Sequence, residues 1–281
     1  RPILDHASNL GAIISYSIAN EIGVNSYIYD PVCVDESGDM AKVSGLNGLD
    51  RVCLTHALNT RAMAIKYAKM NNKNYKDLNL IVVHLGGGIS VGAHKNGKVI
   101  DVNNGLNGEG PFAPTRSGKV LATDLIDMCF SGKYTENEIK ELITKKGGLI
   151  SHLDTSDARD VVKMISEGNK YAKLVYDAMI YQVAKEVGAQ SVVLKGKIDA
   201  IILTGGIAYE EYFVKGLKEY IEFLGKIIII PGEEEMQALA NGVLRVLNGE
   251  EEAQEYTGIP VNKNIVEKWK QKTSFVESID K

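Results

Sequence analysis

The segment 79–102, which reads NLIVVHLGGGISVGAHKNGKVIDV, decides the fold. A glycine triplet separates two apolar runs, and a chain can reverse direction tightly there because glycine has no Cβ. Asn96-Gly97 is a strong two-residue hairpin signal, and a third β-rich run follows it. The segment therefore predicts three consecutive antiparallel strands, which are Asn79–His84, Ile89–His94 and Lys98–Val102.

Downstream, a mostly helical stretch over about 118–190 precedes a regular alternation of short strands and helices. The predicted elements are the strand Ile198–Leu203, the loop Thr204-Gly205-Gly206, the helix Tyr209–Phe223, the strand Lys226–Ile230, the turn Pro231-Gly232 and the helix Glu235–Leu247. This order describes an α/β protein with a mixed sheet flanked by helices. It resembles the ribonuclease-H-like (actin-like ATPase) domain of the actin, sugar-kinase and acetate-kinase superfamily, whose members use two such domains around a nucleotide cleft.

The domain organisation that follows has a complete second domain and a partial first one. Residues 80–247 form the predicted nucleotide-binding domain, with a helical insertion at about 118–190. Residues 1–79 form the partial first domain, which the resemblance makes the acyl- and phosphate-side domain, and residues 248–281 form a peripheral tail. In the first domain we expect a helix at 5–22, a strand at Ser26–Asp30 and a helix at Leu49–Met70, whose inner face would carry Leu54, Leu58, Ala62 and Ile65. A weak helical pattern lies near Ile265–Lys272.

Composition excludes several classes of protein. Hydrophobic residues make up 44% and charged residues 24% of the 281 residues, as in soluble globular proteins. The net charge of −4 disfavours a nucleic-acid partner, and no apolar run reaches the roughly 18 residues of a membrane span. The three scattered cysteines, Cys33, Cys53 and Cys129, suggest neither a disulfide framework nor a zinc site, and they favour a cytoplasmic location.

Two glycine-rich turns are candidate phosphate sites. In the first, Gly86, Gly87 and Gly88 follow His84, and successive backbone N–H groups of such a turn can cradle an anion. His84 could then offer a hydrogen bond or a positive charge to a phosphoryl oxygen. The alternative is a hairpin with a flexible tip and a structurally satisfied histidine. The second turn, Thr204, Gly205 and Gly206, joins a buried strand to a helix, which suits a nucleotide but also an ordinary βα turn.

Three charged sites complete the candidates. Arg116 lies in PFAPTRSG (111–118), where two prolines and a glycine restrict the loop, and a guanidinium matches phosphoryl oxygens in pairs. A loop arginine paired with a carboxylate is the alternative. The turn PGEEEM (231–236) offers three carboxylates, one of which could order Mg²⁺ through water, although glutamates also simply favour a helix start. Asp30 ends the predicted strand Ser26–Asp30 before a proline, where it could cap a turn or face the cleft. Its neighbours Asp35 and Glu36 could take the position at the cleft instead.

Together these motifs resemble the butyrate kinase branch of the acetokinase family over about residues 5–250. The matching pieces are HASNLGA (6–12), YDPVCVDE (29–36), HALN (56–59), HLGGGISVGAHKNGKVIDVNNGLNGEGPFAPTRSG (84–118), GGL (147–149), DAIILTGGIAY (199–209) and PGEEEMQALANG (231–242). The long central block is the most specific of them. The resemblance implies an enzyme that moves the γ-phosphoryl group of ATP to the carboxylate of a short-chain fatty acid, with ATP or ADP and Mg²⁺ bound and a homo-oligomer as its assembly.

The resemblance also implies roles for individual residues. His84 would contact the transferring phosphoryl group, Arg116 would stabilise the transition state, and Asp30 would be the cleft aspartate. Glu234, or its neighbour Glu235, would serve the metal. The adenosine would lie at the second glycine turn, on Thr204, Gly205 and Gly206, while Gly86, Gly87 and Gly88 would hold phosphates.

The sequence departs from the family pattern at its ends. It begins with Arg1-Pro2, and it has no match to the family's opening Asn-Pro-Gly-Ser-Thr-Ser loop or to a further first-domain arginine. We therefore expect an upstream part of the gene product and little or no kinase activity from these 281 residues alone. The alternative function is a non-catalytic, actin-like nucleotide-binding module, which would not require Arg116.

Overall fold

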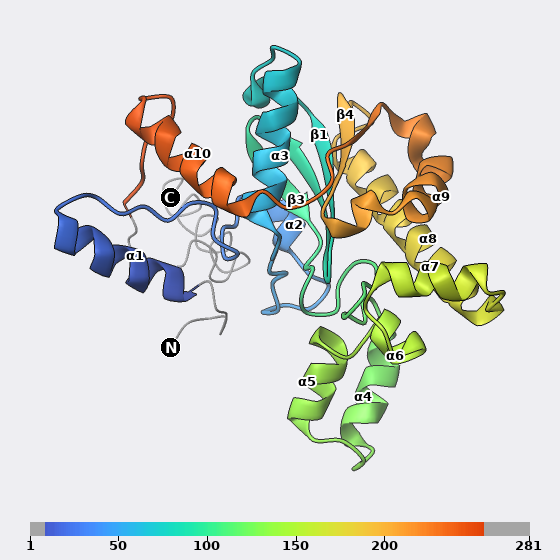
Figure 1. Ribbon diagram of the computed structural model, residues 1–281. Helices are drawn as coiled ribbons and strands as arrows, with labels where there is room; N and C mark the ends of the chain where they lie inside the picture. The colour runs from blue at the N-terminus through green and yellow to red at the C-terminus, as the bar shows by residue number, and fades with distance from the viewer. Residues whose placement is uncertain (1–8, 256–281) are drawn as a thin grey trace, which may run out of the picture.

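The structure is a computed structural model that describes residues 9–255 (Figure 1). At its centre is a five-stranded mixed sheet with the strand order β3-β2-β1-β4-β5. β1 pairs antiparallel with β2, as β2 does with β3, whereas β4 runs parallel to β1 and to β5. The strands are β1 (Leu80–Leu85), β2 (Ile89–Lys95), β3 (Lys98–Val102), β4 (Ala200–Thr204) and β5 (Ile227–Ile229). The predicted antiparallel meander and the two later strands are confirmed.

Both predicted hairpin turns form where the sequence places them. Gly86–Gly88 connects β1 to β2. Asn96 and Gly97 connect β2 to β3, and both have positive φ angles, of 52° and 75°. Left-handed conformations at both central residues are what a type I′ hairpin turn requires, and they explain the choice of Asn-Gly.

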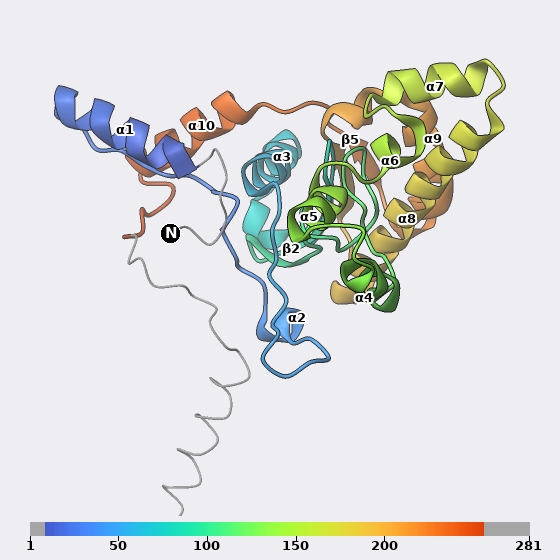
Figure 2. The same ribbon diagram turned by 90° about the horizontal axis from the view of Figure 1, so that it is seen from below.

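Helices cover both faces of the sheet (Figures 1 and 2). One face packs against α8 (Lys170–Val193) and α9 (Glu211–Ile221), and the other against α3 (Ala57–Met70). Side chains alternate along a strand, so residues 81, 83 and 85 of β1 enter the α8 core, whereas residues 80 and 82 enter the α3 core. The same alternation turns residues 84 of β1 and 204 of β4 toward α3.

The helical stretch predicted for 118–190 consists of several helices, which are α4 (Ala122–Phe130), α5 (Glu136–Thr144), α6 (Leu149–Leu153), α7 (Ala158–Ser166) and α8. α4 and α5 project away from the sheet as a pair, below it in Figure 1. On the other side, α10 (Glu235–Leu247) contacts α3, and α1 (Asn9–Ile22) lies on the same side of the sheet as α10 in both views. α2 (Asp39–Lys42) is a single turn. Short 3-10 helices are η1 (Tyr75–Asp77), η2 (Gly206–Tyr209) and η3 (Glu222–Leu224).

Two predictions for the first eighty residues are wrong. Ser26–Asp30 is not a strand, because none of the strands between residues 9 and 255 lies beside it and Asp30 adopts a left-handed conformation with φ 41°. Tyr29 instead packs against Gly242 of α10, where a Cβ atom would lie 2.6 Å from its ring. The helix predicted from Leu49 begins only at Ala57, because the residues before it bond to other loops; the carbonyl of Leu54, for example, accepts from the amide of Gly105.

The buried face of α3 also differs from the prediction. Leu54, Leu58, Ala62 and Ile65 are only partly buried. The buried positions combine apolar side chains with three polar ones. They are Ala57, Met63, Ala64, Tyr67 and Ala68 with Asn59, Thr60 and Arg61. A helix that turns polar side chains inward must give them hydrogen-bond partners, and those partners lie at the candidate site.

Three further predictions have different outcomes. The strand predicted as buried at Lys226–Ile230 is the edge strand β5, and it is only partly buried, with Ile229 38% exposed. The helix predicted near Ile265–Lys272 and residues 5–8 lie outside the described residues. The domain boundary at residue 79 stays a prediction. The helix α3, which precedes residue 79 in the chain, packs on the sheet that follows it. Among residues 9–255 no helix is long and apolar enough to span a membrane.

Candidate active site

The two glycine turns lie side by side at one edge of the sheet. His84 and Thr204 face each other in the register of β1 and β4, so the turns that follow these strands emerge together. Gly205 has φ 88°, and a Cβ atom there would collide with the carbonyl of Leu85. Glycine is therefore required for the second turn to approach the first so closely.

The first turn has amide groups available for an anion. The Gly86 N–H donates to the Gly88 carbonyl at 3.1 Å, and the Gly87 carbonyl accepts from the backbone and the hydroxyl of Thr115 at 3.2 and 2.9 Å. The N–H groups of Gly87 and Gly88 donate to no backbone carbonyl between residues 9 and 255. Consecutive unpaired N–H groups in a turn can bind phosphate oxygens.

His84 lies beneath this turn and is held at both ring nitrogens. Its side chain is 2% exposed; Nδ1 is 3.0 Å from Oδ1 of Asn59, and Nε2 is 3.2 Å from Oε1 of Glu233. The hydrogen bond with His84 lowers the pKa of Glu233. Since both partners are acceptors, an imidazole that satisfies both donates from two nitrogens and is positively charged.

A second histidine, which the sequence analysis did not assign, stacks on the first. The rings of His56 and His84 lie 3.9 Å apart at an interplanar angle of 15°. His56 immediately precedes α3, and its Nδ1 is 2.5 Å from Oγ of Ser90. The only sequence signal for it was the motif HALN (56–59), which does not say that this helix start meets β1.

Arg116 approaches the same turn from the other end. Its guanidinium lies against Gly88, where a Cβ atom would collide with Nη1. Nε donates to the carbonyl of Thr144 at 2.7 Å and Nη1 to that of Gly105 at 3.2 Å. Burial lowers the pKa of Arg116. Unlike the other arginines between residues 9 and 255, it has no carboxylate partner there. The alternative of an arginine paired with a carboxylate therefore finds no support in the described part of the chain.

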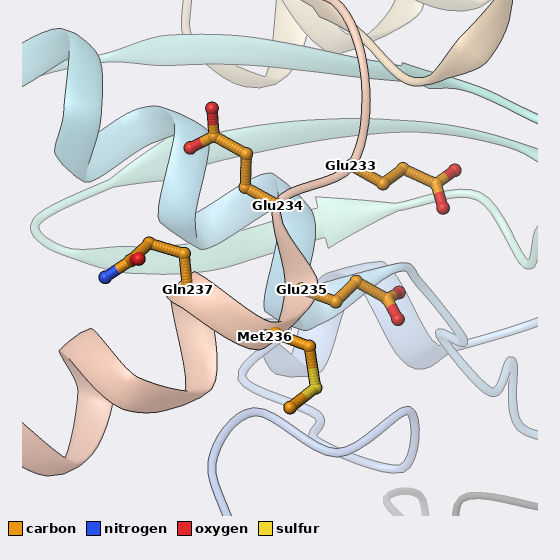
Figure 3. A pocket seen from close by; sticks show the side chains of 5 residues that line it. All are labelled: Glu233, Glu234, Glu235, Met236 and Gln237. Carbon is orange, nitrogen blue, oxygen red and sulfur yellow. The ribbon is translucent and has the colours of Figure 1, made fainter.

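The acidic turn before α10 forms a shallow pocket of about 440 Å³ lined by residues 233–237 (Figure 3). The carboxylates of Glu233 and Glu235 point to one side of it, whereas Glu234 points to the other and pairs with Lys66 at 2.8 Å. No group of three acidic, histidine or cysteine side chains that could hold a metal ion occurs within residues 9–255. The carboxylates of the acidic turn nevertheless suit Mg²⁺, because this ion usually takes one or two carboxylates and completes its shell with water and substrate phosphates.

A second pocket, of about 400 Å³, lies just beyond the second glycine turn. It is formed by η2, the start of α9 and the edge strand β5, with the residues Ala208, Tyr209, Glu210, Glu211, Val214, Lys215, Lys218 and Ile229. Its first lining residue, Ala208, lies two positions after Gly206 in the same 3-10 helix, so there is space near the second predicted nucleotide site.

Asp30 lies in a different group of charges. Its Oδ1 is 2.9 Å from Nε of Arg61, whose Nη2 is 2.6 Å from Glu36. The side chain is 9% exposed, and burial, only partly offset by Arg61, raises the pKa of Asp30 to about 6. The structure thus brings His84, Arg116 and the glycine turns together, whereas Asp30 contacts Arg61. Of its neighbours, Glu36 shares Arg61 and Asp35 pairs with Lys42 at 3.2 Å.

The buried Asp30 carboxyl predicts a pH dependence of stability. The pKa of Asp30 is about 6 in the folded state and 3.8 in the unfolded state, so at pH values between the two only the folded state keeps the carboxyl proton. This proton binding stabilises the folded state at low pH, and the stabilisation is lost as the pH rises through about 6. We expect the free energy of unfolding of wild type minus that of Asp30→Asn to fall by about 2 kcal/mol from pH 4.5 to pH 7.5. Urea unfolding measures it. The exposed Asp124→Asn serves as control, with a flat difference. A flat or rising difference for Asp30→Asn would contradict the prediction.

Comparison with known proteins gives the site a context. The acetokinase family profile matches residues 54–266. Butyrate kinase 2 of Clostridium acetobutylicum is 55% identical over 252 residues, which are 90% of this chain and 71% of that protein. Among solved structures, acetate kinase from Porphyromonas gingivalis superposes with a TM-score of 0.71 at 24% identity, over 78% of this chain and 63% of that one.

Two further structures agree with this picture. Acetate kinase from Entamoeba histolytica has a TM-score of 0.65 at 22% identity, covering 74% of this chain and 62% of that one. A propionate kinase from Francisella tularensis has a TM-score of 0.65 at 22% identity, covering 73% and 60%. The chain thus spans about three fifths of the length of these solved chains.

The sheet order and its helical layers are those of the actin-like ATPase fold, which these kinases share. Within that class the chain belongs to the acetokinase family, whose members are carboxylate kinases. None of these comparisons favours a non-catalytic nucleotide-binding module.

Proposed function

We propose that this protein transfers the γ-phosphoryl group of ATP to the carboxylate of butyrate or a similar short-chain fatty acid, giving an acyl phosphate in a reversible reaction. The observation that carries the proposal is that the imidazole of His84 and the guanidinium of Arg116 flank one glycine turn. Arg116 has no carboxylate partner within residues 9–255, so its charge is available to an anion. The 55% identity with Butyrate kinase 2 supports the choice of acid.

The roles of the residues follow from the charges of the reaction. Both reactants are anions and repel each other, so transfer needs positive charge, alignment and exclusion of water rather than covalent help from the protein. Nε2 of His84 donates to a phosphoryl oxygen in place of Glu233, and the guanidinium of Arg116 binds the equatorial oxygens. The amides of Gly87 and Gly88 hold the phosphates of the nucleotide, with Gly86 closing the turn beneath them, and transfer is direct, from ATP to acid.

The remaining groups bind the nucleotide and its metal. Thr204, Gly205 and Gly206 support the nucleoside, with the 400 Å³ pocket as its space. Glu234 or Glu235 would hold Mg²⁺, which neutralises phosphate charge when bound. Glu235 has no ion pair within the described residues, whereas Glu234 would have to leave Lys66. Asp30 takes the position of the cleft aspartate once its ion pair with Arg61 is broken.

The setting of the protein is also a proposal. The nucleotide substrate and the three cysteines without disulfide partners suit the cytoplasm. The family resemblance supports a homo-oligomer, which sedimentation equilibrium tests directly. We expect neither nucleic acid nor a membrane as a partner.

The length of the acid tests the proposal. We expect kcat/KM for transfer to be highest at four or five carbons and lower for acetate by about 10- to 200-fold per missing methylene, because a pocket shaped for a longer chain leaves a void. Hydroxamate trapping of the acyl phosphate measures it across acids of increasing length, with the 281-residue chain and the full translated product of its gene assayed side by side. Acetate as the best substrate of the full product, or no acyl phosphate from that product with any acid, would contradict the proposal.

A further inference from the structure

Asn59 lies where the two glycine turns and the acidic turn meet. It is the third residue of α3 and is 2% exposed. Its Oδ1 is 3.0 Å from Nδ1 of His84 and 3.3 Å from Oγ1 of Thr204, and its Nδ2 is 3.4 Å from the carbonyl oxygen of Gly232. One buried amide therefore connects the ends of β1 and β4 with the turn that leads into α10.

The surroundings of this amide fix which of its ends faces the histidine. The Gly232 carbonyl can only accept, and Nδ2 carries the only donors of the amide, so the NH₂ group must face Gly232. A reversed amide would place two acceptor oxygens against each other at Gly232. The Thr204 hydroxyl, 3.1 Å from the same carbonyl, donates to it or to Oδ1. The amide oxygen is thus held toward His84, and only a protonated Nδ1 can bond to it.

We propose that Asn59 is the positioning residue of His84: it accepts the Nδ1 proton and so presents Nε2 at the Gly86–Gly88 turn. The stacked ring of His56 sets the plane of the imidazole, but stacking does not select which nitrogen faces outward. The Asn59 oxygen makes that selection without placing a negative charge beside the ring. Partners that orient metal-binding histidines act in the same way. The catalytic consequence rests on the proposed function, whereas the orientation of the ring does not.

Nitrogen NMR of the protein labelled with ¹⁵N-histidine tests the orientation. The chain has five histidines, few enough to assign by single substitution. We expect a protonated Nδ1 at His84, with a proton that exchanges slowly because the ring is buried. Asn59→Leu, of similar volume and without an acceptor, loses this signal, and Asn59→Asp, which keeps an acceptor, retains it. Asn71→Leu removes an exposed amide at the end of the same helix and leaves the signal unchanged.

Kinetics test the consequence. We expect kcat for phosphoryl transfer to fall by roughly 10- to 100-fold in Asn59→Leu while KM for the nucleotide changes little, because the ring is misplaced rather than removed. An unprotonated Nδ1 in the wild-type protein overturns the proposal, and this spectrum is decisive even if Asn59→Leu fails to fold. An unchanged His84 signal in folded Asn59→Leu overturns it as well. A protonated Nδ1 in a protein that transfers no phosphoryl group supports the positioning role and counts against the proposed function.

Discussion

Replacement of Arg116 by alanine is expected to lower kcat for phosphoryl transfer by about three orders of magnitude, while the Kd for ADP rises less than about tenfold. The guanidinium is held by the carbonyls of Thr144 and Gly105, neither of which neutralises it. The guanidinium interacts most strongly with the phosphoryl group in the transition state, when negative charge spreads over the equatorial oxygens of that group. Its removal therefore destabilises the transition state more than the bound nucleotide.

The matched control is Arg159→Ala, which removes an exposed arginine that pairs with Asp157, far from the glycine turns in the chain. It should leave kcat within about twofold of wild type, as surface substitutions usually leave the fold intact. Hydroxamate trapping gives kcat, and titration calorimetry with ADP gives Kd. Arg116→Lys should recover only part of the loss, because an ammonium cannot bind two oxygens with a planar fork. Transfer at the wild-type rate by Arg116→Ala would remove Arg116 from the mechanism.

The central sheet could be predicted because its signals are local. In Asn79–Val102 the apolar runs, the glycine triplet and Asn96-Gly97 each specify a strand or a turn without reference to any distant residue. The strand β3 and the helix α10 accordingly have the bounds that the sequence predicts, Lys98–Val102 and Glu235–Leu247. The same holds for the placement of the second glycine turn after a buried strand.

The wrong predictions concern segments whose structure depends on distant partners. Ser26–Asp30 has strand-forming residues, but a strand needs a neighbour, and Tyr29 finds α10 instead. The face of α3 was predicted from its apolar residues, yet Arg61 is buried because Asp30 and Glu36 surround it. Nothing in the local sequence reveals these carboxylates, which lie 25 or more positions earlier in the chain.

The candidate site shows the same division. His84, Arg116 and the glycines could be named from their motifs, although the roles given to them stay predictions. The contacts of His84 with Asn59 and His56 could not be named, because they depend on which helix covers which face of the sheet. The alternation along β1 places His84 on the face opposite the α8 core, but only the packed structure shows that α3 lies there.

Gly148→Ala is expected to have the largest effect on stability, lowering the free energy of unfolding by at least about 3 kcal/mol. Gly148 has φ 64° and ψ −135°, a conformation nearly restricted to glycine. A Cβ atom there would collide with the carbonyl of Ala113 and lie 2.8 Å from that of Arg116. These backbone oxygens cannot rotate away, because the Ala113 carbonyl accepts from Leu149 and the Arg116 carbonyl from Ala113.

Gly132→Ala separates the strain of the backbone from the collision. Gly132 has a similar φ of 71°, but apart from its two chain neighbours no atom of the described residues lies within 4 Å of its ideal Cβ position, so its replacement should cost only about 1 kcal/mol. Urea unfolding compares the two variants. Since the atoms that Gly148→Ala displaces belong to the loop that carries Arg116, its kcat should also fall, whereas that of Gly132→Ala should not. Equal losses of stability in the two variants would mean that the close packing of residues 147–149 on the Arg116 loop contributes nothing to stability. Equal kcat values would mean that this packing does not hold the guanidinium at the glycine turn.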